Sequence, residues 1–440
     1  MSIALAARAI AATLLGALVA TTGPVWAGSF YLPASDSIAA LGRGYAGQAA
    51  LGYDATSAIS NPAALTRLRA NQYAVGLTAL STDVHIRDQG TTVLGGVVPG
   101  GFPVDGQVDG DASALAGLPN LAYARRVGGA RNLWVGFGLQ APFGLGIEYD
   151  ERFRARYDTR EARLRVIDAS AVVGFELSER VSIGGGINIQ RTDARLENAV
   201  PNLGGTALPG QFASDGVLIL RADSTAVGGN IGLHVRASDS LQLGLHYRSR
   251  ISHDLEGHGT GISLTGPLAA LNGRSAADVR FNLPDIVTAS AAWQATERLA
   301  LMAELRWFNW SRFERLAFQF DVGGTRVPLT RPEAYRDRVN LALGGEYQLN
   351  PAWTLRAGYL LDRTPTPDTT RSVAVPDADR HWFSVGASWA FAPEWTLDMA
   401  YSRIAFEPVR IERVDALGNT VRASGSPSVD VVGLAVRKRF

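Results

Sequence analysis

From about residue 70 to its end, the chain alternates between apolar and polar positions with a period of two. Between residues 299 and 308, one face carries Glu304 and Arg306, whereas the other face is apolar, with Leu299, Leu301, Ala303, Leu305 and Trp307. Residues 241–248 and 382–391 repeat this pattern. Because successive side chains of a strand point to opposite faces, the period predicts β-strands with one apolar and one mixed face.

A soluble sandwich of two sheets would also alternate, so the period alone leaves two fold classes open. Strand length favours a barrel in lipid, because many of the predicted strands exceed ten residues, enough for a tilted strand to cross the hydrocarbon layer. Aromatic residues at strand ends resemble the interfacial girdles of such barrels. They are Trp307 and Trp310, Trp353 and Tyr359, Trp389 and Phe391, and Tyr401 and Phe406.

The connections between the predicted strands alternate in length. Six short turns lie at 128–130, 178–179, 237–239, 295–297, 350–352 and 392–394. Seven long polar or Gly/Pro-rich loops lie near 89–115, 149–161, 198–216, 257–278, 320–335, 364–378 and 411–428. Together they join about 14 strands, an even number, as closed bacterial barrels usually have. In lipid an open sheet edge leaves backbone groups unpaired, so the last strand, 432–440, is expected to close on the first.

The first 27 residues have the pattern of an export signal. Arg8 supplies a positive charge, residues 9–20 form an apolar run, and Val25-Trp26-Ala27 fits a cleavage site. A membrane anchor is the alternative, but the run is shorter than the ~20 residues that a spanning helix needs. We therefore predict a cleaved signal peptide at 1–27 and a mature chain that begins at Gly28.

Residues 28–70 lack the alternation. Within them, Gly42-Arg43-Gly44-Tyr45-Ala46-Gly47 fits G-x-G-x-x-G, but a dinucleotide site needs a buried strand before this motif, and residues 35–40 do not form one. The glycines instead indicate tight backbone bends in a compact plug. We therefore predict an all-β protein: a 14-stranded antiparallel transmembrane β-barrel over 71–440, plugged by a small N-terminal hatch domain over 28–70.

Composition excludes several kinds of site. The net charge is +1, so a nucleic-acid partner is not expected. Cysteine is absent, which removes disulfides, thiolate metal sites and Cys nucleophiles. None of the six histidines has metal-ligand spacing, so we expect no metal and no cofactor. There is no G-x-S-x-G motif, but a Ser-His-Asp triad cannot be assembled from sequence distance, so a barrel hydrolase stays open.

Two of the long loops are unusually apolar. They contain Leu203, Leu208 and Phe212, and Leu264, Leu268 and Leu271. Either these loops pack on each other or dip into outer lipid, or they form a surface groove that captures a hydrophobic ligand.

Basic residues near the strand ends allow a similar choice. They are Arg195, Arg336, Arg371 and Arg380. Either they contact lipopolysaccharide or solvent, or one of them holds a ligand carboxylate inside an apolar lumen, where water is scarce.

Several blocks, in order along the chain, resemble the FadL family of outer-membrane long-chain fatty-acid transporters, whose relatives include importers of aromatic hydrocarbons. The N-terminal blocks are Gly28-Ser29-Phe30, residues 41–47 and Asn61-Pro62-Ala63. The later blocks are residues 282–285, Tyr335-Arg336-Asp337, residues 343–347, residues 353–359 and residues 376–380.

The resemblance implies roles for particular residues. Asn61, Pro62 and Ala63 fall on the gating segment of the hatch, and Phe30 on the ligand pocket. The two apolar loops correspond to the family's capture groove. Residues 134–148 correspond to a strand kinked inward beside a lateral gap, and Gly138, Pro142 and Gly144 there weaken strand pairing. Arg336, and less closely Arg195, match the basic residues that hold the fatty-acid carboxylate.

The sequence therefore predicts a passive importer of hydrophobic small molecules, most of all long-chain fatty acids, in the outer membrane of a Gram-negative bacterium. Neutral aromatic or aliphatic hydrocarbons are the alternative ligands, and an outer-membrane hydrolase or adhesin is the alternative class. We expect a monomer that contacts outer-membrane lipid and lipopolysaccharide. The terminal Phe440 is expected to be read by the barrel-assembly machinery.

Overall fold

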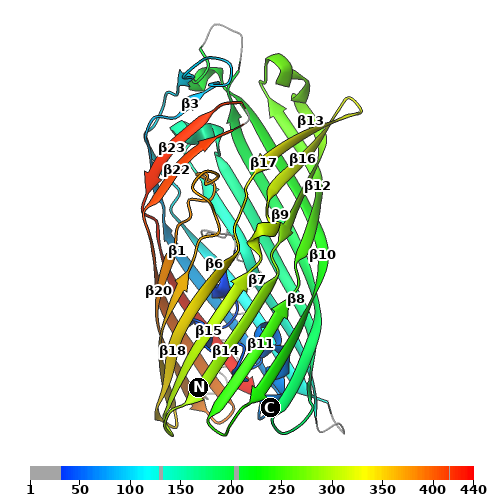
Figure 1. The fold of residues 1–440 in the computed structure, drawn as a ribbon, viewed down its shortest axis with the longest axis vertical. Helices are drawn as coiled ribbons and strands as arrows, with labels where there is room; N and C mark the ends of the chain where they lie inside the picture. Colours follow the sequence, from blue (N-terminus) through cyan, green and yellow to red (C-terminus); the bar gives the residue numbers. More distant parts are fainter. Residues whose placement is uncertain (1–30, 128–131, 203–207, 416) are drawn as a thin grey trace, which may run out of the picture.

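A tall antiparallel β-barrel surrounds a small hatch in the computed structural model of the chain (Figure 1). The structure describes residues 31–127, 132–202, 208–415 and 417–440. The predicted signal peptide, Phe30 and Leu203 lie outside the described residues. No helix in the described ranges is long and apolar enough to cross a membrane.

In the described ranges, fourteen strands close the barrel, as predicted, and four of them are broken into two segments, so that one sheet holds 18 segments. The continuous strands are β1 (Gln72–Asp83), β6 (Ala114–Arg126), β7 (Leu133–Glu148), β8 (Glu161–Glu176), β9 (Val181–Val200), β10 (Gly216–Arg236), β19 (Trp353–Asp362), β20 (Arg380–Ala392), β21 (Trp395–Phe406) and β24 (Ser428–Arg439). The broken strands are β11 (Leu241–Arg248) with β12 (Ile251–Ile262), β13 (Gly273–Leu283) with β14 (Ile286–Gln294), β15 (Leu299–Phe308) with β16 (Arg315–Val322), and β17 (Thr325–Pro332) with β18 (Arg338–Asn350).

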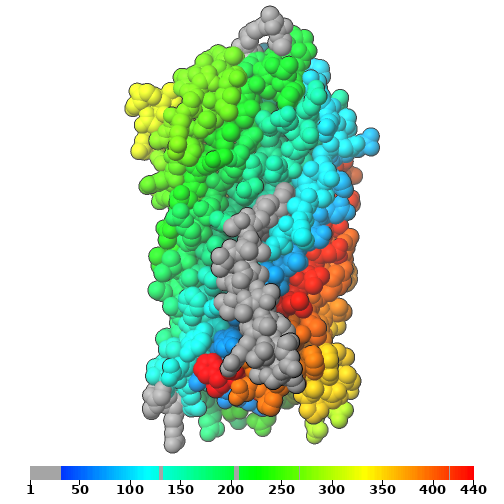
Figure 2. All heavy atoms as spheres, turned by 180° about the vertical axis from the view of Figure 1, so that it is seen from behind, coloured from blue at the N-terminus to red at the C-terminus, as the bar shows by residue number. Residues whose placement is uncertain are grey.

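The last strand closes on the first. β24 pairs with β1 over its full length, from Gln72 opposite Arg439 to Asp83 opposite Ser428. β1 also pairs with β6, and Figure 2 shows the three strands side by side in red, blue and cyan. No edge is left unpaired at this seam, as lipid requires.

The alternation of the sequence becomes an alternation of inside and outside. On β8, β9 and β10, large aliphatic side chains such as Val173, Ile187 and Val227 are half or more exposed on the outer face. The positions between them point inward and include the buried polar residues Ser170 and Asn188. The outer face is therefore an apolar band of the kind that contacts lipid.

The hatch fills the end of the barrel where the turns are short. Its described part comprises η1 (Pro33–Ser35), α2 (Ile38–Leu41), α3 (Ser57–Ser60) and η2 (Pro62–Arg67), drawn in blue in Figure 1. Gly44 and Gly47 have φ of +63° and +74°, and a Cβ on Gly44 would lie 2.8 Å from the backbone N of Tyr359. These glycines let the hatch bend and approach the wall. The division between hatch and barrel at residue 70 stays a prediction; β1 begins at Gln72.

The end with the long loops carries a second sheet that the sequence did not predict. Its strands are β2 (His85–Asp88), β3 (Thr92–Val93), β4 (Phe102–Pro103), β5 (Asp109–Asp111), β22 (Val409–Val414) and β23 (Thr420–Gly425). These strands come from the first and last long loops, which become neighbours only because β1 and β24 pair. Other loops at this end carry the 3-10 turns η3 (Arg154–Tyr157), η4 (Phe212–Ser214) and η5 (Gly266–Leu271), whereas η6 (Trp310–Arg312) lies in the break between β15 and β16.

Candidate functional site

The wall departs from regular pairing at β7. This strand pairs with β8 along its length, with a bulge between Gln140 and Phe143. It pairs with β6 only from Trp134 to Leu139, opposite Arg126 to Leu121. Past Leu139, no residue pair in the described chain joins β7 to β6. β6 itself stays paired with β1 as far as Ala114. The wall is therefore interrupted between β6 and the second half of β7.

The hatch holds the inward bend of β7. Pro142 lies in the bulge, and its carbonyl accepts a hydrogen bond from the backbone N of Leu32 (2.8 Å). Tyr31 forms a bridge with Phe143, and their rings lie edge to face at 5.6 Å. Gly138 stands just before the bulge and Gly144 just after it. These residues lie at the interruption, whereas their role in ligand exit stays a prediction.

An apolar cavity of about 70 Å³ lies inside the barrel between the bend and the long loops. Its apolar side chains come from at least five strands and include Leu145, Leu164, Leu196, Leu220, Val279 and Phe281. Ligand pockets in proteins commonly measure about 300 Å³ or more. A long acyl chain therefore fits this cavity only if neighbouring side chains move apart.

The lining of the cavity also carries charge, from Arg163, Arg331 and Glu333. Arg163 Nη2 lies 3.1 Å from Glu161 Oε1, and Arg331 Nε lies 3.0 Å from Glu333 Oε1. Arg331 also lies 3.6 Å from Asp158 Oδ1 through an Nη atom. A guanidinium in the lining of an apolar cavity can hold a carboxylate strongly, because little water competes for it.

The two arginines predicted to hold a carboxylate lie elsewhere. Arg195 is on the face of β9 opposite to the cavity-lining Ala194 and Leu196, and it contacts Glu161 Oε2 (2.5 Å) and Glu197 Oε2 (2.8 Å). Arg336 is exposed, whereas Tyr335 before it is buried. The structure does not bring either side chain into the cavity, so their role stays a prediction that this geometry does not support.

The other two flagged arginines are buried in ion pairs. Arg380 Nη2 lies 2.7 Å from Asp362 Oδ2, and Arg371 Nη1 lies 2.8 Å from Asp368 Oδ1. Arg331 was not predicted from the sequence. It lies in Thr330-Arg331-Pro332-Glu333, which has the composition of a solvent-facing loop, so the sequence gives no sign that Arg331 lines a cavity.

The two apolar loops lie together at the long-loop end. Asn202 joins them: its Nδ2 donates to Ser214 O (3.0 Å) and Ser263 O (2.6 Å), and its Oδ1 accepts from Thr265 N (3.0 Å). Leu208 is 61% exposed and Leu264 only 3% exposed. Phe212, Leu268 and Leu271 are half-buried. The loops thus pack on each other and still present apolar side chains to the outside.

The Asn-Pro-Ala segment of the hatch contacts the wall directly. Asn61 Nδ2 donates to Ala49 O (2.7 Å) within the hatch and to Leu233 O (3.1 Å) on β10. Its Oδ1 accepts from Ala63 N (3.1 Å), which caps the turn that begins at Pro62. One amide therefore organises the hatch turn and joins it to the barrel, although a gating role for Asn61, Pro62 and Ala63 stays a prediction.

A buried charged cluster joins the hatch to β15. Arg306 Nη2 donates to Gln48 Oε1 (2.8 Å) and to Glu304 Oε1 (2.6 Å), and Arg306 also contacts the Tyr31 hydroxyl. Glu304 Oε2 accepts from the backbone N of Gln48 (2.7 Å). Asp36 lies in the same cluster, where burial raises its pKa to about 6, although Arg306 and Arg248 favour its charged form.

This raised pKa predicts a pH dependence of hatch stability. The pKa of Asp36 is higher in the folded hatch than its ordinary 3.8, so the protonated carboxyl favours the folded hatch. This stabilisation of the hatch is complete below pH 3.8 and is lost as the pH rises through 6. The hatch is then less stable at pH 7.5 than below pH 3.8 by on the order of 3 kcal/mol. We expect amide exchange in residues 36–50, corrected for intrinsic rates, to speed up over this range. Asp36→Asn should remove most of the dependence, and an unchanged profile in this variant would contradict the assignment.

Comparison with known proteins places the chain among outer-membrane barrels. The family model of the outer membrane protein transport protein (OMPP1/FadL/TodX) matches residues 17–440. Outer membrane protein P1 of Haemophilus influenzae is 26% identical, over 92% of this chain and 92% of that protein. The long-chain fatty acid transport protein of Escherichia coli K12 is 24% identical, over 90% of this chain and 91% of that protein.

Solved structures share the fold. A Pseudomonas aeruginosa FadL homologue superposes with a TM-score of 0.85 at 24% identity, over 94% of this chain and 100% of that chain. The Ralstonia pickettii toluene transporter TbuX superposes with a TM-score of 0.65 at 20% identity, over 89% of this chain and 95% of that chain.

Proposed function

Because the chain belongs to the FadL/TodX family of outer-membrane transporters of hydrophobic compounds, we propose that its own substrates are long-chain fatty acids. The observation that carries this proposal is the apolar cavity with Arg331 in its lining, which offers apolar walls to an acyl chain and a cation to its terminal carboxylate once neighbouring side chains move apart. The Escherichia coli relative, named for long-chain fatty acid transport, supports it. A hydrolase or an adhesin does not require such a cavity, so we propose import rather than catalysis or adhesion.

We propose a path without a cofactor or an energy source. Apolar side chains of the loops joined by Asn202 collect the ligand, which then enters the cavity. A rearrangement of the hatch around Asn61 and Tyr31 loosens the cavity, and the ligand leaves sideways through the interruption between β6 and β7. The acyl chain then avoids the aqueous mouth of the barrel, where exposure costs about 0.8 kcal/mol for each CH₂.

Uptake measurements test the proposal. Cells that lack their own importer, with and without this protein, are given labelled oleate and labelled toluene. We expect faster entry of oleate with the protein; no acceleration of either compound would overturn the importer proposal.

Neutral hydrocarbons are the second candidate substrates. Glu333 and Asp158 already balance the charge of Arg331, so an uncharged ligand could enter the cavity without breaking an ion pair. The fold shared with a toluene transporter is consistent with such ligands. Faster entry of toluene but not of oleate in the uptake experiment would favour this candidate.

Replacing Arg331 separates the two substrate classes. We expect Arg331→Ala to weaken oleate binding about tenfold, because a charge-assisted contact is lost, and to leave toluene binding unchanged. Arg336→Ala is the matched control, since that side chain is exposed. Binding is measured by tryptophan fluorescence in detergent. A loss of oleate binding in Arg336→Ala alone would instead favour the residue predicted from the sequence.

We also propose how the outer leaflet is contacted. Arg195, Arg221 and His258 lie side by side across β9, β10 and β12 on the outer face, and Arg274 Nη2 lies 3.2 Å from His258 Nδ1. On β10, Arg221 lies closer to the long loops than the apolar, exposed Val227 does. The three basic residues therefore lie at the level where phosphates of lipopolysaccharide would lie.

A double variant tests this contact. Arg221→Ala with Arg274→Ala should reduce the lipopolysaccharide that copurifies with the protein, because two phosphate contacts are lost. Arg236→Ala, at the other end of β10, should not. Equal copurification would contradict the proposal. Recognition of Phe440 by the assembly machinery and a monomeric state stay proposals.

A further inference from the structure

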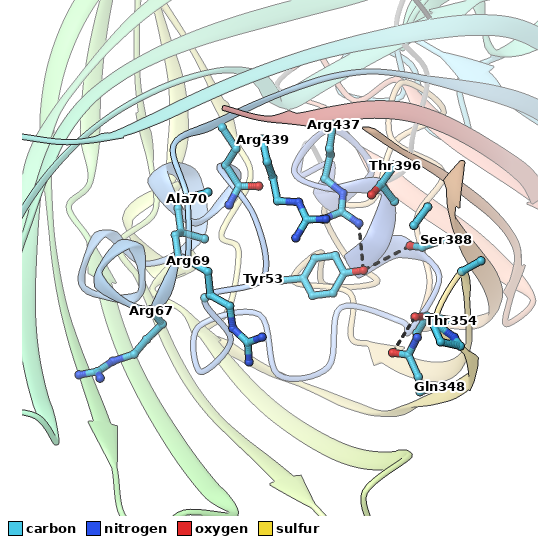
Figure 3. A pocket seen from close by; sticks show the side chains of 16 residues that line it. Tyr53, Arg67, Arg69, Ala70, Gln348, Thr354, Ser388, Thr396, Arg437 and Arg439 are labelled. Atoms are coloured by element: carbon cyan, nitrogen blue, oxygen red, sulfur yellow. Dashed lines mark hydrogen bonds between the residues drawn. The ribbon is translucent and has the colours of Figure 1, made fainter. Parts of the chain in front are cut away.

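A second cavity, of about 310 Å³, lies at the opposite end of the barrel, between the hatch and the wall (Figure 3). The hatch contributes Tyr53 and residues 67–70, and the wall contributes residues near two short turns and the end of β24. In outer-membrane barrels the short turns face the periplasm, so this cavity opens toward that compartment. Its polar lining distinguishes it from the apolar ligand cavity above the hatch.

The lining is strongly basic. Arg67, Arg69, Arg437 and Arg439 line the cavity, and none of the described residues of its lining is Asp or Glu. Arg437 is paired with Asp398, with Nη2 at 3.0 Å from Oδ1, and Arg67 lies 3.5 Å from Glu176. Arg69 and Arg439 form no ion pair within the part of the chain that the structure describes. The cavity therefore carries about two positive charges in excess.

The hatch residue Tyr53 orders the arginines around it. Its ring centroid lies 4.6 Å from the guanidinium carbon of Arg437 and 4.8 Å from that of Arg356. The Tyr53 hydroxyl accepts a hydrogen bond from Arg437 Nη2 (3.1 Å). Figure 3 shows the side chains of Arg69, Arg437 and Arg439 gathered around Tyr53, whereas Arg67 points away. Arg437 is thus a donor group held in place before any ligand arrives.

We propose that this cavity binds a small oxyanion with two negative charges, of the phosphate or phosphomonoester class. Arg69 from the hatch and Arg439 from the wall supply the unbalanced charges, and guanidinium groups match the geometry of phosphate oxygens. Gln348, Thr354 and Thr396 line the same space and supply uncharged hydrogen-bonding groups. The volume lies at the lower end of the range for ligand pockets, which suits a compact anion.

The anion joins two parts of the molecule. Arg69 lies in the segment between the hatch turn η2 and β1, whereas Arg439 ends the last strand. A phosphate held by both therefore ties the base of the hatch to the wall. This site lies beyond the proposed import path, which leaves the barrel sideways, and it does not depend on that path.

Titration with inorganic phosphate tests the site. The protein is purified in a neutral detergent, and calorimetry is done at constant ionic strength, because added salt weakens every surface charge interaction. We expect saturable binding of one phosphate to the wild type and about tenfold weaker binding to Arg69→Ala and to Arg439→Ala. Arg180→Ala, at an exposed position in a short turn whose residues do not line the cavity, is the matched control and should bind as the wild type does.

The source of the phosphate group is distinguished in nanodiscs. If the natural occupant is a soluble anion, phosphate binds equally in discs that contain phosphatidic acid, whose headgroup is a phosphomonoester, and in discs of phosphatidylcholine alone. If a lipid headgroup occupies the cavity, phosphatidic acid competes with added phosphate in the wild type but not in Arg69→Ala.

Two results would overturn the site itself: no saturable binding to the wild type, or equal affinity of the wild type and the two cavity variants. Arg69 precedes β1 and is not part of a barrel strand, so Arg69→Ala keeps the test decisive if Arg439→Ala fails to assemble.

Discussion

Replacing Leu220 by Trp is expected to reduce uptake of oleate at least tenfold while the barrel stays folded. Leu220 is buried on the inner face of β10 and lines the apolar cavity of about 70 Å³. A larger ring there fills the space that a ligand must enter and costs about 1–3 kcal/mol in packing, too little to unfold a barrel of this size. Uptake is measured in cells, and folding by the heat-dependent mobility of the barrel on gels.

The same strand offers a matched control. Leu233 lies on β10 as well, but its side chain is 37% exposed on the outer face. Leu233→Trp makes the same chemical change outside the cavity and should leave uptake unchanged. If Leu220→Trp cells take up oleate at the wild-type rate, the ligand does not pass through this cavity.

Replacing Arg306 by Ala is expected to release the hatch from the wall. Glu304 is 3% exposed, and loss of Arg306 would leave this carboxylate buried without its cation. Breaking a buried pair in this way costs about 3–5 kcal/mol. We expect amide exchange in residues 36–50 to become faster by on the order of a hundredfold or more.

The control for this variant is Arg298→Ala, an exposed arginine near the start of the same strand. Exchange in the hatch of this control should match that of the wild type. An Arg306→Ala protein whose hatch remains as protected as the wild type would show that the hatch is held by its apolar packing and by Asn61 instead.

Several features follow from local sequence alone. Strands with apolar and mixed faces follow from a period of two, because side chains of a strand alternate whatever lies beside it. The number of strands follows from the alternation of short and long connections. Closure follows from the same evidence, since lipid leaves no stable alternative to pairing the last strand with the first.

Other features depend on which strands become neighbours. The unpredicted sheet of β2–β5, β22 and β23 forms because the first and last long loops meet above the β1–β24 seam. The inward bend of β7 similarly depends on Leu32, a hatch residue more than a hundred positions earlier in the chain.

The two sites show this limit of sequence most clearly. Residues 333–337 interrupt the alternation between β17 and β18, so the sequence pattern could not show that Arg331 lines the cavity and that Arg336 is exposed. Arg69 and Arg439 are unremarkable in the sequence, and they share a cavity only because Gln72 pairs with Arg439 when the barrel closes. Alternation is a local property that the sequence determines, whereas these clusters depend on pairing between distant segments, which only the tertiary structure decides.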